Sequence, residues 1–404
     1  MTSGKHAGDG AISDAMRETV KGASFIRQAF EEGVRLKREL GEDRVFDLSL
    51  GNPSAPPPPE VFAALRECAA ESRAEDHRYM TNAGRLDLRT ELAQRLSRQH
   101  GMALGPEHVV MTCGAAGGLN VLLKSVLDPG DEVIVLVPYF PEYLFYIQNH
   151  GGRPRAVPCD ADFQPDLAAI EAALGPRTRA IIVNTPNNPS GVVYAPERVE
   201  AIGRLIDAHS DRIGRPVYLF SDEPYRRVRY VPGEHPSALR CSRHGFVVTS
   251  YSKELGLAGE RIGYVVLNPR SPGIADLFAA LGIATRILGF VNAPAFMQRV
   301  IRRCADALVD LGSYRENRDI LWQAMTAAGY EMPHPDGAFF LFPAVPGGDD
   351  IAFCRALKEK LVLVVPGTGF GCPGRFRVSY AVPRRVVEAA APLFAAVRQD
   401  YART

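Results

Sequence analysis

Lysine is scarce in this chain of 404 residues. It occurs seven times, and arginine supplies the rest of the 47 basic side chains. Between positions 125 and 357 the only lysine is Lys253. Any reaction that needs a lysine amine in the middle of the chain must therefore use Lys253.

Paired cysteines are also missing. The seven cysteines are scattered, odd in number and never spaced as C-x-x-C. This pattern argues against a zinc site or a disulfide framework and favours reduced thiols, as in a cytosolic protein. The sequence predicts no metal site.

Neither sign of charge dominates, and long hydrophobic runs are absent. The 47 basic side chains balance 46 acidic ones, so the chain lacks the basic footprint of a nucleic-acid binder. No run approaches the roughly 18 apolar residues that a membrane span needs, and residues 1–10 lack the apolar core of a signal peptide. We expect a cytoplasmic protein with no membrane or nucleic-acid partner.

What the chain does contain is an alternation of strand-length apolar runs with longer helix-periodic stretches. The predicted strands are 109–113, 132–138, 153–159, 179–185, 217–222, 246–250 and 262–267. Several are almost wholly apolar, as in strands buried on both faces of a mostly parallel sheet. Crossover helices are predicted at 115–127, 142–150, 166–174 and 196–209. The pattern predicts an α/β fold with a doubly wound, mostly parallel central sheet of about seven strands.

The alternation of apolar runs and helix-periodic stretches changes after about residue 295. A long helical stretch near 296–328 precedes short strands at 338–342, 361–365 and 375–381, with helices near 350–360 and at the end. We therefore predict a large domain over 45–295 and a smaller α+β domain over 296–404. Residues 1–44 are predicted to be partly mobile, with a surface helix, and to pack on the small domain or on a partner subunit.

Lys253 ends a group of polar residues at the end of a predicted strand. It follows Ser250, and Arg261 comes eight residues later at the start of the next strand. An amine that can form an imine, beside donors that can hold a phosphate, is what a phosphate-bearing aldehyde requires. Taken alone, the same residues also suit a surface loop with a solvated lysine.

Two neighbouring strands end in polar residues as well. Asp222 ends the strand 217–222 and is followed by Tyr225. A carboxylate at this edge of an open sheet can keep a pyridine nitrogen protonated, and a phenol can donate to a ring oxygen. Asn188 follows the strand 179–185, within a turn whose amides can reach the same edge. The structural alternative is that Asp222 only caps the turn that follows it.

A run of small residues follows the strand 109–113. Gly114, Ala115 and Ala116 open the next predicted helix, where backbone N–H groups and the helix dipole favour a phosphate. The same glycine also suits close packing of the helix on the sheet. This turn is not the spaced dinucleotide fingerprint.

Together these residues resemble the fold-type I, class I/II aminotransferase family over nearly the whole chain, from about 45 to 400. The order of the motifs carries the resemblance: Gly51-Asn52-Pro53, Tyr79 to Gly84, the Gly114 turn, Pro138-Tyr139-Phe140, Asn188-Pro189-Ser190-Gly191, Asp222 with Tyr225, Ser250 to Lys253, Arg261, Gly337-Ala338-Phe339 and Arg375 to Ser379. The resemblance implies that the large domain binds pyridoxal 5'-phosphate, which Lys253 holds as a Schiff base.

The resemblance also assigns roles around the cofactor. Lys253 would move a proton between the substrate and the cofactor, while Asp222 would pair with the pyridine nitrogen. The remaining cofactor contacts that it implies are Tyr225 and Asn188 at the ring oxygen, Phe140 on the ring face, and Ser250, Arg261 and the Gly114, Ala115 and Ala116 turn at the phosphate. Tyr79 would reach the phosphate from a neighbouring subunit, which implies a homodimer with active sites at the interface.

On the substrate side the resemblance implies contacts from Gly51, Asn188 and Arg377. Arg377 would bind the α-carboxylate as a bidentate pair, although the neighbouring Arg375 leaves the alternative that either arginine lies on the surface. Arg286 lies where dicarboxylate-specific relatives hold the substrate side chain, and a solvated interface arginine is the alternative. The sequence departs from the family pattern in Glu260 before Arg261 and in the lack of a hydroxyl in the Gly114 turn.

The implied activity is transfer of an amino group between an L-amino acid and a 2-oxo acid. Lyases and synthases on the same fold, for example those that act on S-adenosylmethionine or by elimination or replacement, share every cofactor residue. We expect the substrate-facing residues Tyr79, Tyr143 and Arg286 and the segment 1–35 to separate these reactions. A third possibility is an effector sensor in a transcription regulator, but only about 44 residues precede the resemblance, without a recognition-helix pattern.

Overall fold

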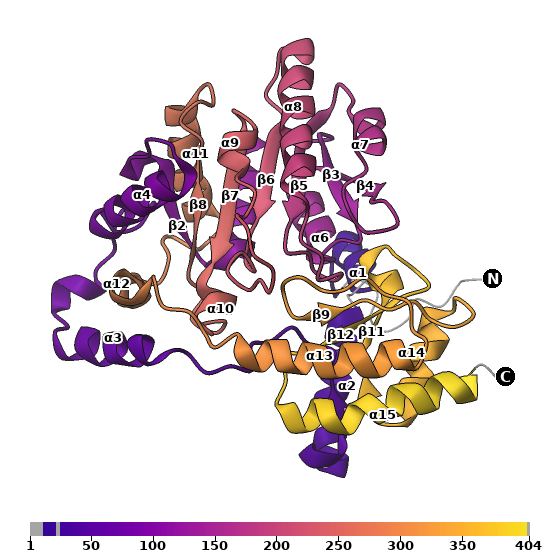
Figure 1. Ribbon diagram of the computed structural model, residues 1–404. Coiled ribbons are helices and arrows are strands. Elements are labelled where there is room, and N and C mark those ends of the chain that lie inside the picture. Colours follow the sequence, from indigo (N-terminus) through magenta and orange to yellow (C-terminus); the bar gives the residue numbers. More distant parts are fainter. Residues whose placement is uncertain (1–10, 22–24, 402–404) are drawn as a thin grey trace.

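A seven-stranded sheet forms the centre of the computed structural model, which describes residues 11–21 and 25–401 (Figure 1). In spatial order its strands are β2 (Val109–Thr112), β8 (Gly263–Val266), β7 (Gly245–Ser250), β6 (Tyr218–Asp222), β5 (Thr178–Asn184), β3 (Glu132–Val137) and β4 (Arg153–Pro158). Neighbouring strands are parallel except at β8, which runs antiparallel to β2 and β7. The prediction of a mostly parallel sheet is confirmed.

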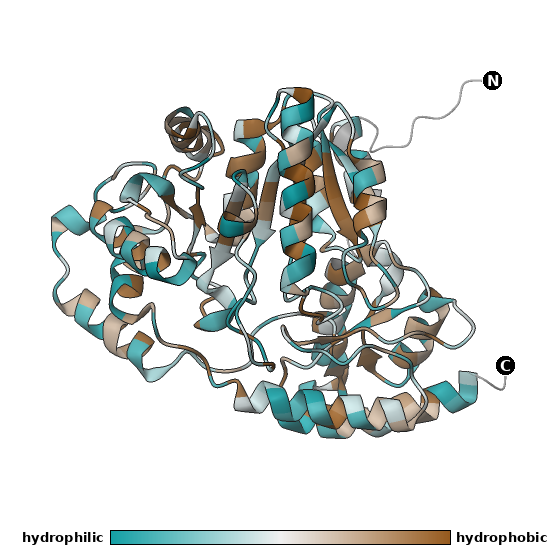
Figure 2. Ribbon diagram, turned by 45° about the horizontal axis from the view of Figure 1, so that its top comes forward, coloured by the Kyte–Doolittle hydropathy of each residue, from teal (hydrophilic) through white to brown (hydrophobic). Residues whose placement is uncertain are grey.

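Helices cover both faces of this sheet because its strands are apolar on both sides. In β7, Val247 packs into one hydrophobic cluster and Val248 into another, since successive side chains of a strand point to opposite faces. The first cluster includes residues of α4 (Leu86–His100), α8 (Pro196–Ile213) and α12 (Ala295–Cys304), and the second includes residues of α5 (Gly114–Val126), α6 (Glu142–Asn149) and α11 (Ile274–Ile287). Figure 2 shows the hydrophobic colour concentrated on the strands and the hydrophilic colour on the outer helix surfaces.

Local sequence signals set the ends of the crossover helices. Asp166 precedes α7 (Leu167–Ala173), and its carboxylate accepts hydrogen bonds from the backbone N–H groups of Ala168 and Ala169. Helix α8 begins at Pro196 and ends before Gly214, which has a φ of 65°. These caps place the strand ends, and therefore the turns that follow them, at defined positions.

A smaller set of elements lies beside the carboxyl edge of the central sheet (Figure 1). It contains the antiparallel strands β11 (Val365–Pro366), β12 (Phe376–Ser379) and β9 (Phe340–Leu341), the parallel pair β1 (Phe46–Asp47) and β10 (Val362–Leu363), and the helices α13 (Gly312–Ala327), α14 (Asp350–Glu359) and α15 (Arg384–Tyr401). These elements enclose a hydrophobic cluster of their own. The domain boundaries at 44/45 and 295/296 stay a prediction.

The long helical stretch expected near 296–328 is wrong as one continuous element, because it forms two helices, α12 and α13. The Arg227 guanidinium donates hydrogen bonds to the backbone carbonyls of Ala305, Asp306 and Ala307 between them. The Val309 N–H donates to the Glu254 carbonyl at 2.8 Å. These tertiary contacts satisfy backbone groups that a continuous helix would have paired internally.

The N-terminal part contributes α1 (Asp14–Lys21) and α2 (Phe25–Leu40). Glu32 of α2 pairs with Lys358 of α14 at 2.5 Å, and Leu36 packs with Val45 and Leu363. The predicted mobility of the first residues concerns residues 1–10, which lie outside the described residues.

The remaining helical segments connect these parts of the chain. They are α3 (Pro59–Ala70), α9 (Ala238–Cys241) and α10 (Tyr251–Glu254), with short 3₁₀ turns at Glu42–Arg44, Ala74–His77, Pro106–His108 and Gly367–Phe370. Among the residues that the structure describes, none of the helices combines the length and the apolar character needed to cross a membrane.

Candidate active site

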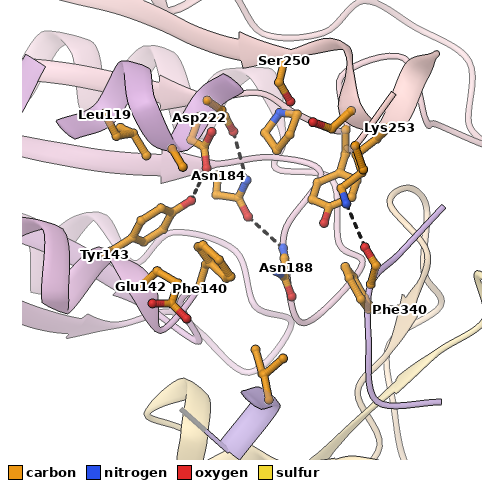
Figure 3. A pocket seen from close by; sticks show the side chains of 18 of the residues that line it. Leu119, Phe140, Glu142, Tyr143, Asn184, Asn188, Asp222, Ser250, Lys253 and Phe340 are labelled. Carbon is orange, nitrogen blue, oxygen red and sulfur yellow. Dashed lines mark hydrogen bonds between the residues drawn. The ribbon is translucent and has the colours of Figure 1, made fainter. Parts of the chain in front are cut away.

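A cavity of about 320 Å³ opens at the carboxyl ends of three neighbouring strands (Figure 3). Asn184 ends β5, Asp222 ends β6 and Ser250 ends β7, and all three line the cavity. Phe340 and Arg377 face it from the smaller sheet. Over the described ranges, no group of three or more His, Cys, Asp and Glu side chains could hold a metal ion.

Most of the residues singled out in the sequence line this one cavity: Gly51, Ala115, Ala116, Phe140, Asn188, Asp222, Tyr225, Ser250, Lys253, Arg261 and Arg377. Three others do not line it: Gly114, which is the first residue of α5, Tyr79 and Arg286. The Tyr79 side chain is 89% exposed, and Arg286 is exposed in the last turn of α11. Neither lines the cavity of its own chain, so a contribution of Tyr79 or Arg286 to a neighbouring subunit stays a prediction.

Lys253 lies in the short helix α10, directly after β7. Its Nζ donates a hydrogen bond to the Gly51 carbonyl at 2.8 Å (Figure 3). Desolvation, with smaller contributions from the positive charges of Arg261 and Arg377, lowers the pKa of the Lys253 amine to about 8. A neutral amine, which is the nucleophilic form, is therefore accessible near neutral pH.

Asp222 lies on the opposite side of the cavity and is 5% exposed. Its Oδ2 accepts a short hydrogen bond from the Tyr143 hydroxyl, whereas Oδ1 is buried with no hydrogen-bond partner among the described residues. Burial, with a smaller contribution from Glu223, raises the pKa of Asp222 to about 7, although the Tyr143 hydrogen bond favours the ionised form. The Oδ1 atom is thus a buried acceptor that a cationic N–H group could satisfy.

Tyr143 also lines the cavity, and the expectation that it faces the substrate stays a prediction (Figure 3). Its side chain is 2% exposed, and its hydroxyl is committed to Asp222. Tyr143 is the second residue of α6, and its ring packs edge-on against that of Phe140, with the ring centroids 5.5 Å apart.

Asn184 is a site residue that the sequence analysis missed. Its amide Nδ2 donates to the Asp222 carbonyl at 3.0 Å, and its Oδ1 accepts from the Asn188 N–H at 2.8 Å (Figure 3). It thereby joins the ends of two strands to the turn that carries Asn188. The available signal was a polar residue ending an apolar strand, the same signal that identified Asp222.

Arg261 and the start of α5 form a second positively polarised region. Gly114 has a φ of 71°, and a Cβ atom there would lie 3.0 Å from Nη2 of Arg261. Glycine therefore allows the guanidinium to approach the turn. The first N–H groups of α5, at Ala115 and Ala116, have no intrahelical acceptor and are suited to an anion.

Arg377 is a buried guanidinium on β12, 2% exposed, with aromatic rings on either side. It lies 4.5 Å from the Phe340 ring centroid and 4.9 Å from that of Phe370. Nη1 donates to Asn188 Oδ1 at 2.9 Å and Nη2 donates to the Ser49 carbonyl at 2.5 Å. Burial lowers the pKa of Arg377 to about 10, so it stays charged at neutral pH.

No carboxylate of the described residues is paired with Arg377, and its Nε is buried without a hydrogen-bond partner. A substrate carboxylate would supply the missing charge and acceptor. The neighbouring Arg375 does not line the cavity, and its guanidinium lies 4.7 Å from the Phe163 ring centroid.

Aromatic side chains form the remaining walls. Tyr225 is 5% exposed and packs edge-on against Phe339 and Phe340, with centroid distances of 5.3 and 5.9 Å. Burial raises the pKa of its phenol, which therefore acts as a donor at neutral pH. The site thus combines an amine, a buried carboxylate, an anion-binding turn and a buried guanidinium within one cavity.

Comparisons with known proteins agree with this geometry. Residues 43–392 match the family model described as aminotransferase class I and II. The chain is 34% identical to an aspartate/prephenate aminotransferase of Thermus thermophilus, over 89% of this chain and 92% of that protein. It is 31% identical to a valine–pyruvate aminotransferase of Mycobacterium tuberculosis, over 88% and 91% respectively. The crystal structure of an amino transferase from Eubacterium rectale superposes with a TM-score of 0.92 at 37% identity, covering 96% of this chain and 99% of that one.

Proposed function

Because the chain belongs to the class I and II aminotransferase family and is thus an enzyme that transfers amino groups, we propose that its cofactor is pyridoxal 5'-phosphate. We further propose that an L-amino acid and a 2-oxo acid are its substrates. The observation that carries the proposal is the presence, in one cavity, of the Lys253 amine and the unpaired Asp222 carboxylate oxygen.

The residues of the cavity fit this cofactor. Oδ1 of Asp222 would accept a hydrogen bond from the protonated pyridine nitrogen. This bond would give the buried Oδ1 atom the partner that it lacks. Ser250, Arg261 and the first N–H groups of α5 would bind the phosphate. Tyr225 and Asn188 would contact the ring oxygen, and Phe140 would pack on the ring face. Gly114 leaves room for the Arg261 guanidinium at the phosphate.

When bound, pyridoxal phosphate supplies a carbonyl that condenses with amines and a ring that takes up electrons. The protein supplies the rest of the chemistry. Arg377 orients the substrate by binding its α-carboxylate, beside Asn188 and Gly51. Nζ of Lys253, with its lowered pKa, takes the proton from the substrate α carbon. Asp222 holds the proton on the pyridine nitrogen.

Transamination is favoured over a lyase or synthase reaction. The named relatives with which the chain was compared are aminotransferases. The cofactor residues are shared between these reactions, so the names of the relatives decide in favour of amino-group transfer.

We propose a homodimer in which Tyr79 reaches the neighbouring active site. The observation behind this proposal is the 89% exposure of a large aromatic side chain. A cytoplasmic location is also proposed and fits the seven free cysteines of the described chain.

The test has two steps. Purified protein is incubated with pyridoxal phosphate and reduced with borohydride, and peptide mass spectrometry should place the pyridoxyl group on Lys253. The loaded enzyme is then mixed with single amino acids. Conversion of the cofactor to its pyridoxamine form, with release of the matching 2-oxo acid, supports transamination. Product release without that conversion would indicate a lyase, and labelling of another lysine would remove the proposed site.

A further inference from the structure

Glu142 is a carboxylate in the cavity that the proposed chemistry does not use. It is the first residue of α6, it is partly exposed, and it lines the cavity near Phe140 (Figure 3). Within the described part of the chain it has neither a hydrogen bond nor an ion pair through its side chain. Its charge is therefore available to a ligand.

The basic side chains that line the cavity already have partners in the proposed site. They are Lys253 and Arg261 on the cofactor side and Arg377 for the α-carboxylate. Arg286 does not line the cavity of its own chain. Among the described residues, no further cation of this chain faces the cavity to neutralise a second carboxylate on the substrate.

The surroundings of Glu142 strengthen its electrostatic effect. Apolar side chains, among them Leu50, Leu119 and Phe140, form other parts of the cavity wall. Burial raises the pKa of the Glu142 carboxyl, and no positive group offsets that effect. The pKa of Tyr146, which burial raises, is raised further by the negative charge of Glu142. An anion in such a place repels a distal carboxylate and favours a hydrogen-bond donor.

We propose that the amino-acid substrate has an apolar stem that ends in an amino, guanidino or other N–H donor group, which Glu142 binds. The proposal rests on the transaminase function proposed above. It assigns Glu142 as a residue that determines specificity and excludes aspartate and glutamate as preferred donors. In this respect the chain would differ from the aspartate aminotransferases among its relatives.

The test measures kcat/KM of the loaded enzyme with ornithine, lysine and arginine, with leucine and norleucine, and with aspartate and glutamate. We expect at least one basic donor to exceed both acidic donors by about tenfold or more. In Glu142→Gln, the ratio of basic to neutral donors should fall by about tenfold, because the charge-assisted hydrogen bond is lost.

The matched control is Glu197→Gln. Glu197 also lies in the first turn of a helix directly after a proline, but it is exposed on α8, outside the cavity. This variant removes the same kind of favourable charge at a helix N-terminus without altering the cavity. The donor ratio should be unchanged in it.

Equilibrium binding gives a second measurement that does not depend on turnover. An α-methyl amino acid has no α proton to lose, so calorimetry with α-methylornithine and α-methylaspartate reports recognition alone. α-Methylornithine should bind to the loaded enzyme more tightly than α-methylaspartate. Its affinity should fall about tenfold in Glu142→Gln.

Two results would overturn the inference: a preference for aspartate or glutamate, or an unchanged ratio and affinity in Glu142→Gln. If the first result is found, its loss in Arg286→Ala would assign the acidic side chain to Arg286 instead. Failure of every amino acid to convert the cofactor would instead remove the proposed function. In that case the binding measurement still decides whether Glu142 recognises a basic side chain.

Discussion

Burial brings the pKa values of Lys253 and Asp222 close to neutrality. Desolvation lowers the pKa of the Lys253 amine to about 8 and raises that of the Asp222 carboxyl to about 7, so both groups titrate near neutrality. Neither value follows from the sequence, because each depends on side chains far apart in the chain. What the sequence does establish is that Lys253 has no rival lysine in the middle of the chain.

Replacement of Lys253 by alanine should lower kcat by about 10³-fold or more, since the group that moves the proton is lost. The visible absorbance that pyridoxal phosphate acquires on covalent attachment should also disappear. Lys124→Ala, which removes an exposed lysine of α5, is the control and should retain both. Full activity in Lys253→Ala would contradict the proposed function.

Replacement of Tyr143 by phenylalanine should shift the pH dependence of pyridoxal phosphate binding to the cofactor-free protein. The Tyr143 hydroxyl donates to Asp222 and favours its ionised form, so its loss raises the pKa of Asp222 further. The acidic limb of the binding profile should therefore move to higher pH by about one unit, the equivalent of one charge-assisted hydrogen bond. An unchanged limb would show that Tyr143 has only a packing role.

At the scale of elements, the sequence predicted the central sheet well. All seven strands lie within one residue of their predicted bounds at each end, because apolar runs between turn residues are a local signal. No local pattern predicts the pairing of the two-residue strands β1 and β10, because it depends on contact between segments more than 300 residues apart. The break between α12 and α13 was missed for the same reason, since the backbone between these helices accepts hydrogen bonds from Arg227, 78 to 80 residues earlier in the chain.

Most of the candidate site was predictable because its residues follow strand ends. Asp222, Ser250 and Lys253 share this position, and parallel strands bring their carboxyl ends to one edge. The direction of a side chain within a helix is a tertiary property. For this reason the sequence did not single out Glu142, which lines the cavity.

The turn before α5 makes a testable contribution to phosphate binding. In Gly114→Ala, the new methyl group would meet Arg261 at 3.0 Å in a backbone with a φ of 71°. We expect the affinity for pyridoxal phosphate to fall about tenfold, as measured by fluorescence titration. Gly101→Ala is the matched control, because Gly101 has a φ of 61° but open space around its Cβ position. It should cost about 1 kcal/mol of stability and leave the affinity unchanged.

For the whole molecule, cofactor binding should appear as thermal stability. A ligand that binds only the folded state adds about 2.7 kcal/mol at a hundred times its Kd, so Tm should rise with the concentration of pyridoxal phosphate. Asp222→Asn should give a smaller rise at each concentration, because the amide is a weaker partner for the pyridine cation. Asp162→Asn, at an exposed position, should match the unmodified protein.

The guanidinium of Arg377 belongs to β12, yet it holds the side chain of Asn188 and the backbone of Ser49. One group therefore connects three stretches of chain that are far apart in sequence. An anion that accepts a hydrogen bond from Nε would hold Arg377, and with it these three stretches, in place. Even a simple carboxylate should therefore slow the exchange of backbone amide hydrogens in each stretch. A substrate bound in this way would act as a temporary crosslink, and recognition of its carboxyl group would at the same time stabilise the tertiary structure around it.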